Sequence, residues 1–271
     1  MKKRIDYDIN EVRPYINWLY FNFAWGLLGK PASEKAKLRV DADAMLDTFA
    51  RRYRTHAVFG LFDANSDGDD LLLGTMRIPM LRQQHPAKAG EPNLCLADFV
   101  RPLSSGVPDR VGAFAVTVDG AMEHDFRGDD YQRMLAQTLA DRLAEATVEI
   151  MHEQVRRTYW GYAPNESLTK EELFSEQFQG IRPAIGYPSL PDTSVNFLLS
   201  QLVGMKDIGI TLTESGAMRP HASVSGFMFA HPEARYFNLG KIGHDQLADY
   251  ARRRGVPVEM MRRFLASSLT D

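Results

Sequence analysis

The sequence is poor in cysteine. Cys95 is the only one among 271 residues, so no disulfide can form within the chain. The sequence also lacks a run of about 18 apolar residues, the length that a membrane-spanning helix needs. Its basic start, Met1 to Arg4, is followed by Ile5-Asp6-Tyr7-Asp8 rather than by the apolar stretch of a signal peptide. These absences favour a cytoplasmic protein without a membrane partner.

Charge of one sign is not concentrated anywhere along the chain. Lysine and arginine together number 32 and aspartate and glutamate 35, which gives a formal net charge of −3. A nucleic-acid-binding protein usually carries a basic patch or stripe, and a polybasic membrane anchor carries a run of lysine and arginine. We therefore expect neither nucleic acid nor a membrane surface among the partners.

Several motifs of enzyme chemistry are missing. The seven histidines are scattered, and no pair has the spacing of zinc ligands. The chain contains no G-x-G-x-x-G, Walker or G-x-S-x-G sequence. Residues 63–68 match the first half of a calcium-binding EF-hand loop, but the twelfth position is Gly74 instead of glutamate. A hairpin turn over residues 63–70 is the better interpretation, and we expect no protein-bound metal.

The spacing of apolar residues indicates helices and strands in separate groups. A long amphipathic helix is expected over residues 129–157, with Glu145 on its flank. The other expected elements are helices over residues 36–53, 244–254 and 257–269 and strands over residues 112–118, 208–212, 223–229 and 235–239. Because the two kinds of element are grouped rather than alternating, the pattern favours an α+β fold with a mainly antiparallel sheet.

The segment from Gly180 to Asp192 breaks this regularity. It carries two glycines and three prolines, which forbid regular helix and strand. Long irregular segments inside compact domains are often functional. Arg182 stands near its start, and a guanidinium binds a carboxylate through two parallel hydrogen bonds. The residues alone leave two interpretations open, a carboxylate-binding loop or a surface connector with a solvated arginine.

Two further residues are ambiguous by themselves. Glu145 lies on the flank of the long helix, where a carboxylate is usually solvated. Tyr236 lies in an expected strand, where its side chain points away from those of Arg235 and Phe237. Tyr236 is compatible with the core or with the wall of a pocket, and Glu145 alone is weak evidence for a site.

One run inside the irregular segment resembles a known signature. Gly180-Ile181-Arg182-Pro183-Ala184-Ile185-Gly186-Tyr187-Pro188 is similar to the R-P-A-x-G-Y-P sequence of the activation domain of cobalamin-dependent methionine synthase. Further blocks that look like this family occur in the family's order at residues 96–100, 112–117, 139–146, 159–166, 212–215 and 222–226. The resemblance therefore covers nearly the whole chain.

This resemblance implies a C-shaped single domain over residues 1–271, with a bent antiparallel sheet and helices packed around it. It also implies that the chain binds S-adenosylmethionine and supports the reductive methylation of an inert cob(II)alamin. The electron is expected from flavodoxin or a similar reductase. Because the reduced cobalt is the nucleophile, the resemblance implies no catalytic residue in this chain.

The resemblance also implies a set of ligand-binding residues. Arg182 is expected to hold the carboxylate of the ligand, and backbone groups of the loop are expected to fix the rest. The implied ligand-binding residues are Arg182, Ala184, Gly186, Tyr187, Glu145, Tyr236 and Asn17.

The chain departs from the family at three places. Asn17 stands where the family has a charged aspartate, and Phe237 stands where it often has a second tyrosine. Residues 189–192 lack the cysteine and histidine that are common there. A charged hydrogen bond is worth more than a neutral one, so Asn17 predicts S-adenosylmethionine binding that is weaker by about tenfold.

The cobalamin itself is expected on another protein. The sequence has no D-x-H-x-x-G cobalamin motif, so the expected partner is the cobalamin-binding domain of a split methionine synthase or another corrinoid protein. Two alternatives stay open. One is a non-catalytic module that docks on a cobalamin domain with a weakened or lost ligand site, and the other is an S-adenosylmethionine-binding protein of unrelated chemistry.

Overall fold

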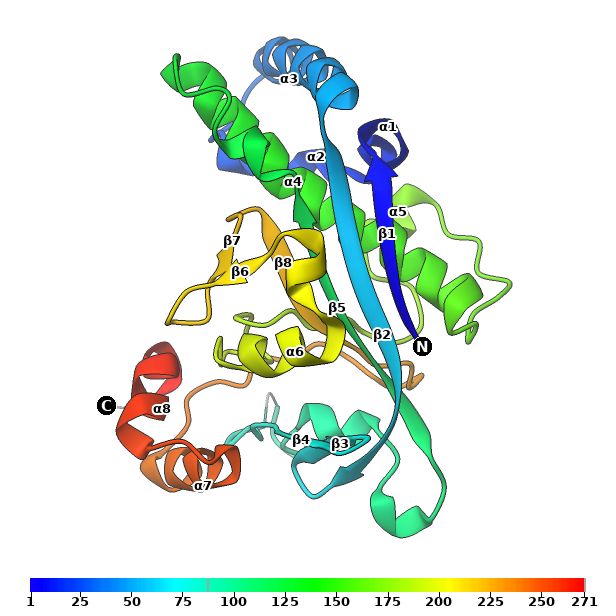
Figure 1. The fold of residues 1–271 in the computed structure, drawn as a ribbon, viewed down its shortest axis with the longest axis vertical. Helices are drawn as coiled ribbons and strands as arrows, with labels where there is room; N and C mark the ends of the chain where they lie inside the picture. Colours follow the sequence, from blue (N-terminus) through cyan, green and yellow to red (C-terminus); the bar gives the residue numbers. More distant parts are fainter. Residues whose placement is uncertain (87, 271) are drawn as a thin grey trace.

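A bent six-stranded sheet forms the centre of the molecule. The computed structural model describes residues 1–86 and 88–270 (Figure 1). The strands of the sheet are β1 (Lys2–Asp8), β2 (Arg54–Asp67), β3 (Asp70–Leu73), β4 (Met76–Pro79), β5 (Asp109–Val118) and β8 (Ser223–Met228). They are ordered β4-β3-β2-β5-β8, with β1 also beside β2, and every pairing is antiparallel. The predicted α+β fold with an antiparallel sheet is confirmed.

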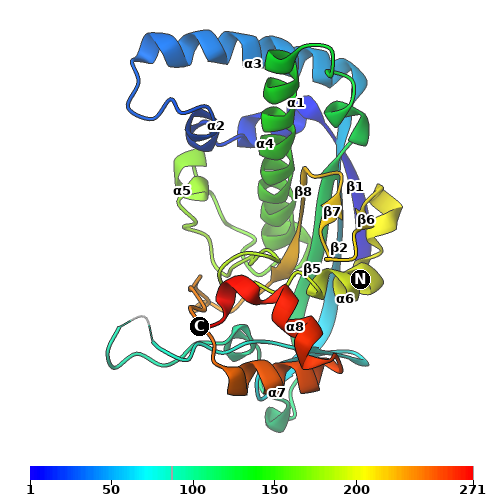
Figure 2. The ribbon, with the colours of Figure 1, turned by 90° about the vertical axis from the view of Figure 1, so that its left-hand side faces the viewer.

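The described helices lie on both faces of this sheet and beside it (Figure 1). They are α1 (Ile9–Val12), α2 (Trp18–Ala24), α3 (Ala32–Arg52), α4 (Asp130–Gln154), α5 (Lys170–Phe174), α6 (Val195–Val203), α7 (His244–Arg254) and α8 (Val258–Phe264). In Figure 2, α3 and α2 extend to one side at the top, and the loop after β4 extends to the same side at the bottom. These two arms produce the C-shaped outline.

Strands β2 and β5 are buried on both faces because alternate residues enter different cores. Phe59 faces Phe114 in the register of the two strands, and both join the core beneath α3 and α4. Val58 faces Ala115, and both join the core beneath α6 and the Gly180–Asp192 loop. This is the period of two that a strand imposes on its side chains. The predicted strand over residues 112–118 is confirmed as part of β5, and it is buried on both faces.

Helix α4 provides the longest wall beside the sheet. Its N-cap is Asp129, whose Oδ1 accepts the backbone N–H of Gln132 at 2.7 Å. Leu135, Leu139 and Leu143 recur every fourth residue and are buried. The predicted end at residue 157 is slightly wrong, since the α-helix ends at Gln154 and continues as a π-helical turn over Val155–Tyr159. Single π-helical turns are frequent at functional sites.

Two of the predicted strands are wrong. In the run 208–212 only Thr211–Leu212 (β6) forms a strand, paired with Met218–Arg219 (β7) in a separate two-stranded ribbon. Residues 235–239 form no strand. Leu239 is instead buried in a third core with α7 and α8. Burial of apolar residues without strand pairing produced the misleading pattern.

The EF-hand-like segment is mostly a strand. β2 continues to Asp67, which faces Asp70 of β3 in the register, so only Gly68 and Asp69 form the turn. Gly68 has a φ of +58°, which glycine adopts without strain. The predicted turn over residues 63–70 is therefore too long. Along an extended strand, successive side chains alternate between the two faces, so those of residues 63–67 do not converge.

No helix in the described ranges combines the length and the apolar character that crossing a membrane requires.

Candidate functional site

The irregular loop from Gly180 to Asp192 is held against the outer strand β8 by backbone hydrogen bonds. Ile181 and Phe229 exchange two of them, both at 2.9 Å. Further along, the N–H of Ile185 donates to the carbonyl of Ser225 at 2.8 Å, and that of Phe227 donates to the carbonyl of Pro183 at 3.2 Å. The loop is thus irregular, as predicted, but firmly docked.

Gly226 makes this close approach possible. A Cβ at this position would lie 2.2 Å from the carbonyl oxygen of Pro183 and 3.0 Å from the Cα of Ala184. Real Cβ atoms do not come so near a backbone oxygen, so any larger residue would push the loop away from the sheet. A glycine inside a strand often marks such an approach.

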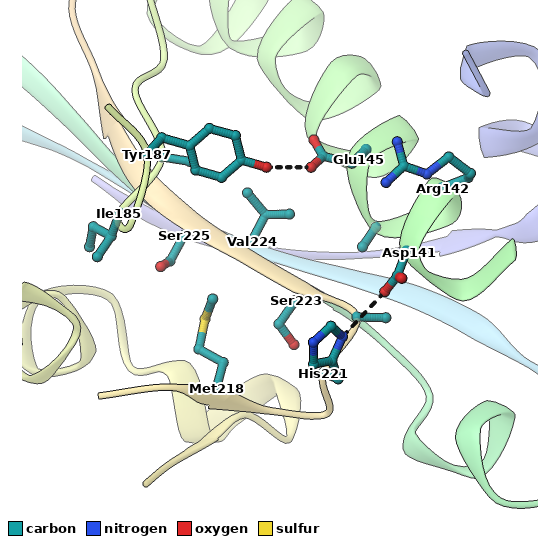
Figure 3. Close-up of a pocket in the computed structure, with 13 residues that line it drawn as sticks. Asp141, Arg142, Glu145, Ile185, Tyr187, Met218, His221, Ser223, Val224 and Ser225 are labelled. Atoms are coloured by element: carbon teal, nitrogen blue, oxygen red, sulfur yellow. Dashed lines mark hydrogen bonds and ion pairs between the residues drawn. The ribbon is translucent and has the colours of Figure 1, made fainter. Parts of the chain in front are cut away.

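Three neighbouring cavities open between this loop and helix α4, and strand β8 contributes to the lining of two of them. The central cavity has about 450 Å³ and is lined by residues that include Arg182, Ala184, Tyr187, Tyr236 and Phe237. The α2-side cavity has about 380 Å³, and the ribbon-side cavity, shown in Figure 3, has about 220 Å³. Glu145 and Tyr187 line all three. The cavities therefore form one groove whose parts meet at these two side chains.

Tyr187 and Glu145 are joined by a hydrogen bond. The phenol donates to Oε1 at 3.1 Å (Figure 3). The negative charge of Glu145, together with burial, raises the pKa of Tyr187 to about 12. The phenol therefore stays protonated at neutral pH and serves as a donor. The family resemblance implied that both residues belong to one site, and the structure brings them into contact across 42 positions of the chain.

Arg182 lies at the floor where the central and α2-side cavities meet. Its side chain is only 10% exposed, and its Nη2 forms an ion pair with Oε1 of Glu149. Its Nη1 lies 3.3 Å from Nδ1 of His152. Its backbone N–H donates to the hydroxyl of Tyr236 at 3.0 Å. The guanidinium is thus a buried, oriented cation rather than the solvated arginine of the alternative interpretation.

Carboxylates surround this cation. The α2-side cavity is lined by three glutamates and two arginines, a formal balance of −1: Glu145, Glu149, Glu176, Arg142 and Arg182. Burial raises the pKa of Glu149, and the charge of Arg182 opposes that shift. Such a site can bind a ligand that carries one anionic group and one or more cationic groups.

Asn17 and Gly186 occupy more peripheral positions. Asn17 is the N-cap of α2, where its Oδ1 accepts the N–H of Leu19 at 3.1 Å, and it lines the α2-side cavity. Gly186 has a φ of +92°, and its N–H donates to the carbonyl of Leu190 at 2.8 Å. It is absent from the described linings of the three cavities, so its visible role is to bend the loop.

Glu149 and Glu176 are two of the lining residues that the sequence analysis did not identify. Glu149 follows Glu145 by four positions, so a helical projection would have placed both on one face of α4. Glu176 lines two of the cavities and has a φ of +57°. Non-glycine residues in this region are uncommon and concentrate at functional sites. No sequence signal marks Glu176.

The described residues contain no group of three or more histidine, cysteine, aspartate or glutamate side chains placed to hold a metal ion.

Comparison with known proteins yields two findings. Residues 8–255 match a family described as "Vitamin B12 dependent methionine synthase, activation domain". The chain is also similar to a crystal structure of the MetH reactivation domain bound to AdoHcy, with 40% sequence identity and a TM-score of 0.95. That similarity covers 100% of this chain and 91% of the other, so it includes the loop, α4 and all three cavities.

Proposed function

The chain belongs to the activation-domain family of vitamin B12-dependent methionine synthase, and from this premise we propose that it binds S-adenosylmethionine in the groove between α4 and the Gly180–Asp192 loop. Its role is to present the methyl group of this ligand to a cob(II)alamin held by a partner. The observation that carries the proposal is the buried Arg182 guanidinium at the floor of a groove that several carboxylates and phenols also line.

The chemistry of the ligand matches this lining. S-adenosylmethionine carries a carboxylate, an ammonium and a sulfonium group. Arg182 suits the carboxylate, because a guanidinium has several N–H donors in one plane. Glu145 and Glu176 suit the cationic groups, and the faces of Tyr187 and Tyr236 add aromatic surface that attracts a cation. AdoHcy, bound by the similar MetH domain, is the thioether that remains once the methyl group has left.

The chain's contribution to the reaction is binding and orientation. When the partner's cobalamin is present and reduced, its cobalt supplies the nucleophile for the methyl group. The electron that reduces the cobalt comes, on this proposal, from flavodoxin or a similar reductase. Holding the donor in the correct geometry converts the encounter into an effectively unimolecular step, so no acid, base or nucleophile is needed from this chain.

The proposed partner is a cobalamin-binding domain of methionine synthase or of another corrinoid protein. The chain would dock over it so that the groove faces the corrin ring. A second candidate function is docking without methyl donation. The neutral Asn17 in the α2-side cavity and Phe237 in the central cavity favour it, since Asn17 lacks the charge and Phe237 the hydroxyl that the family resemblance implies.

Calorimetry and a rescue assay test the proposal. We expect the chain to bind S-adenosylmethionine and AdoHcy, and Arg182→Ala to lose most of that affinity. Arg110→Ala, a half-exposed arginine of β5, is the matched control and should bind normally. Mixing the chain with S-adenosylmethionine, a reductant and a cob(II)alamin synthase that lacks its activation domain should regenerate the methylcobalamin spectrum, with AdoHcy as the second product. Binding of the partner without measurable ligand affinity would favour the second function, and absence of both would contradict the proposal.

A further inference from the structure

Two arginine side chains lie within hydrogen-bonding distance of His152, which stands on α4. Its Nδ1 lies 2.8 Å from Nη1 of Arg156 and 3.3 Å from Nη1 of Arg182. A guanidinium can only donate hydrogen bonds, so Nδ1 must be the unprotonated nitrogen of the ring. The proton therefore lies on Nε2, which faces the hydroxyl of Tyr162 at 3.4 Å. The geometry defines His152 as a neutral acceptor.

The surroundings keep His152 in that state. The side chain is fully buried, and burial followed by the charges of Arg156 and Arg182 lowers the pKa of His152 well below its ordinary value of 6.5. Arg156 is itself fixed by Glu166, which accepts from its Nε at 2.7 Å and from its Nη2 at 2.6 Å. Arg156 lies in the π-helical turn that continues α4. His152 is therefore a rigid support on the inner side of Arg182.

Glu149 directs its polar contact to the same guanidinium. Its Oε1 pairs with Nη2 of Arg182, and its buried Oε2 has no hydrogen-bond partner among the described residues. Leaving a buried carboxylate oxygen unpartnered costs stability. A purely structural carboxylate would be expected to use both oxygens. Among the described residues, the Glu149 carboxylate therefore forms hydrogen bonds only with Arg182.

Arg182 has N–H donors that its contacts with Glu149 and His152 do not use. A guanidinium has five N–H groups, and the side-chain contacts within the described ranges use one on Nη1 and one on Nη2. Three remain, enough for two parallel hydrogen bonds to a carboxylate. Arg182 lines two of the cavities, so its side chain lies within reach of a ligand in the groove.

We propose that Glu149 and His152 are positioning residues, which hold the Arg182 guanidinium so that its remaining N–H groups meet the carboxylate of the ligand. This inference rests on the proposed binding of S-adenosylmethionine and names the residues that shape its amino-acid end. A guanidinium on a flexible four-bond side chain loses rotational freedom when it binds. Because Glu149 and His152 already hold the guanidinium in one orientation in the folded protein, less rotational freedom is lost when the ligand binds. Such preorganisation strengthens binding.

The test compares two ligands that differ at the amino-acid end. AdoHcy carries the carboxylate, whereas 5′-methylthioadenosine has the same thioether nucleoside without it. Calorimetry with each ligand would be run on the wild type, Glu149→Gln, Arg182→Met and the double variant Glu149→Gln/Arg182→Met. Glu153→Gln is the control, because Glu153 is an ion-paired carboxylate on the same helix outside the three cavity linings.

We expect Glu149→Gln to weaken AdoHcy binding by about tenfold and to leave the affinity for 5′-methylthioadenosine within about twofold. In the Arg182→Met background the same change should have no further effect, since it acts only through the guanidinium. Glu153→Gln should bind both ligands as the wild type does. Thermal unfolding checks that each variant is folded. Should Glu149→Gln not fold, Glu149→Asp, which keeps the charge at a shorter reach, should show a smaller loss for AdoHcy alone.

Two results would overturn the inference. One is an equal loss for both ligands in the Glu149 variant, which indicates a general structural role. The other is a full loss for AdoHcy on adding Glu149→Gln to Arg182→Met, which indicates action independent of the guanidinium. A wild type that binds neither ligand overturns the proposed function itself, and the inference with it. That result is distinct from both of the others.

Discussion

The phenol of Tyr187 donates a hydrogen bond to Oε1 of Glu145 at 3.1 Å, and this contact joins the Gly180–Asp192 loop to helix α4 where three cavities meet. An elongated ligand that occupies two of the cavities must therefore pass beside this bond. The pair also links a residue of the proline-containing signature to a residue that looked like an ordinary helix-flank carboxylate in the sequence.

The ionisation of Tyr187 should report on this contact. The pKa of Tyr187 is raised to about 12, first by the charge of Glu145. We expect Glu145→Gln to lower that pKa toward the ordinary value of 10.0. Because the folded state holds the proton more tightly than the unfolded chain, the stabilisation is complete below pH 10 and is lost as the pH rises toward 12. Ultraviolet titration of each protein against its Tyr187→Phe counterpart isolates this one phenol, and an unchanged pKa would contradict the assignment.

Restoring a charge at position 17 should strengthen ligand binding. Asn17→Asp keeps the cap of α2, since aspartate and asparagine are equally good N-caps, and it adds a carboxylate to the α2-side cavity. A charged hydrogen bond exceeds a neutral one by about 1 kcal/mol, so we expect S-adenosylmethionine to bind about five- to tenfold more tightly. Calorimetry checks this. Asn65→Asp, on β2 outside the three cavity linings, should leave the affinity unchanged.

A side chain at Gly226 should separate the loop from the sheet. Gly226→Ala places a Cβ 2.2 Å from the carbonyl of Pro183, and overpacking of this kind costs about 1–3 kcal/mol. We expect a lower free energy of unfolding in urea and weaker ligand binding together, because the loop carries Arg182 and Tyr187. Gly128→Ala, where nothing lies within 4 Å of the added carbon, should change stability by less than about 0.5 kcal/mol. Equal effects of the two variants would contradict the docking of the loop on β8.

Acid should weaken the fold through His152. Its pKa is well below 6.5 in the folded state, because of burial and then of the charges of Arg156 and Arg182. Below pH 6.5 the unfolded chain binds a proton that the folded chain does not, so stability falls as the pH is lowered. His152→Asn keeps an acceptor near Nδ1 but cannot titrate, so its stability should fall less steeply between pH 7 and pH 5. Urea unfolding across this range measures the slope, and the exposed His85→Asn should retain the wild-type slope.

The buried ion pair itself should be dispensable for stability. Arg182→Met leaves Glu149 buried without its cation, and breaking such a pair costs about 3–5 kcal/mol at neutral pH. The double variant Arg182→Met/Glu149→Leu replaces both charges with apolar groups, which is often neutral or stabilising. We therefore expect the double variant to recover the wild-type free energy of unfolding while ligand binding stays lost. Failure of the second change to recover any stability would indicate that the pair is needed for folding.

Much of the frame could be predicted from local patterns. The apolar period of α4, the doubly buried run of β5 and the prolines of the Gly180–Asp192 loop each reflect a preference that a residue carries wherever it stands. The family resemblance then implied that Arg182, Tyr187 and Glu145 belong to one site. Local patterns failed at residues 235–239, where a strand was predicted and none forms. Leu239 is buried in the third core instead, and burial there leaves an apolar pattern similar to that of a strand buried in a sheet.

Local sequence thus determined the long helices, the central strands and the irregular loop, and which chemical groups are available. Only the tertiary structure decided their partners: that Arg182 turns to Glu149 and His152, that Tyr187 meets Glu145, and that Glu176 enters the groove from a strained turn. The physical reason is that these contacts join residues distant along the chain or depend on one side-chain orientation among several. Both are settled by packing of the whole molecule, which no short stretch of sequence encodes.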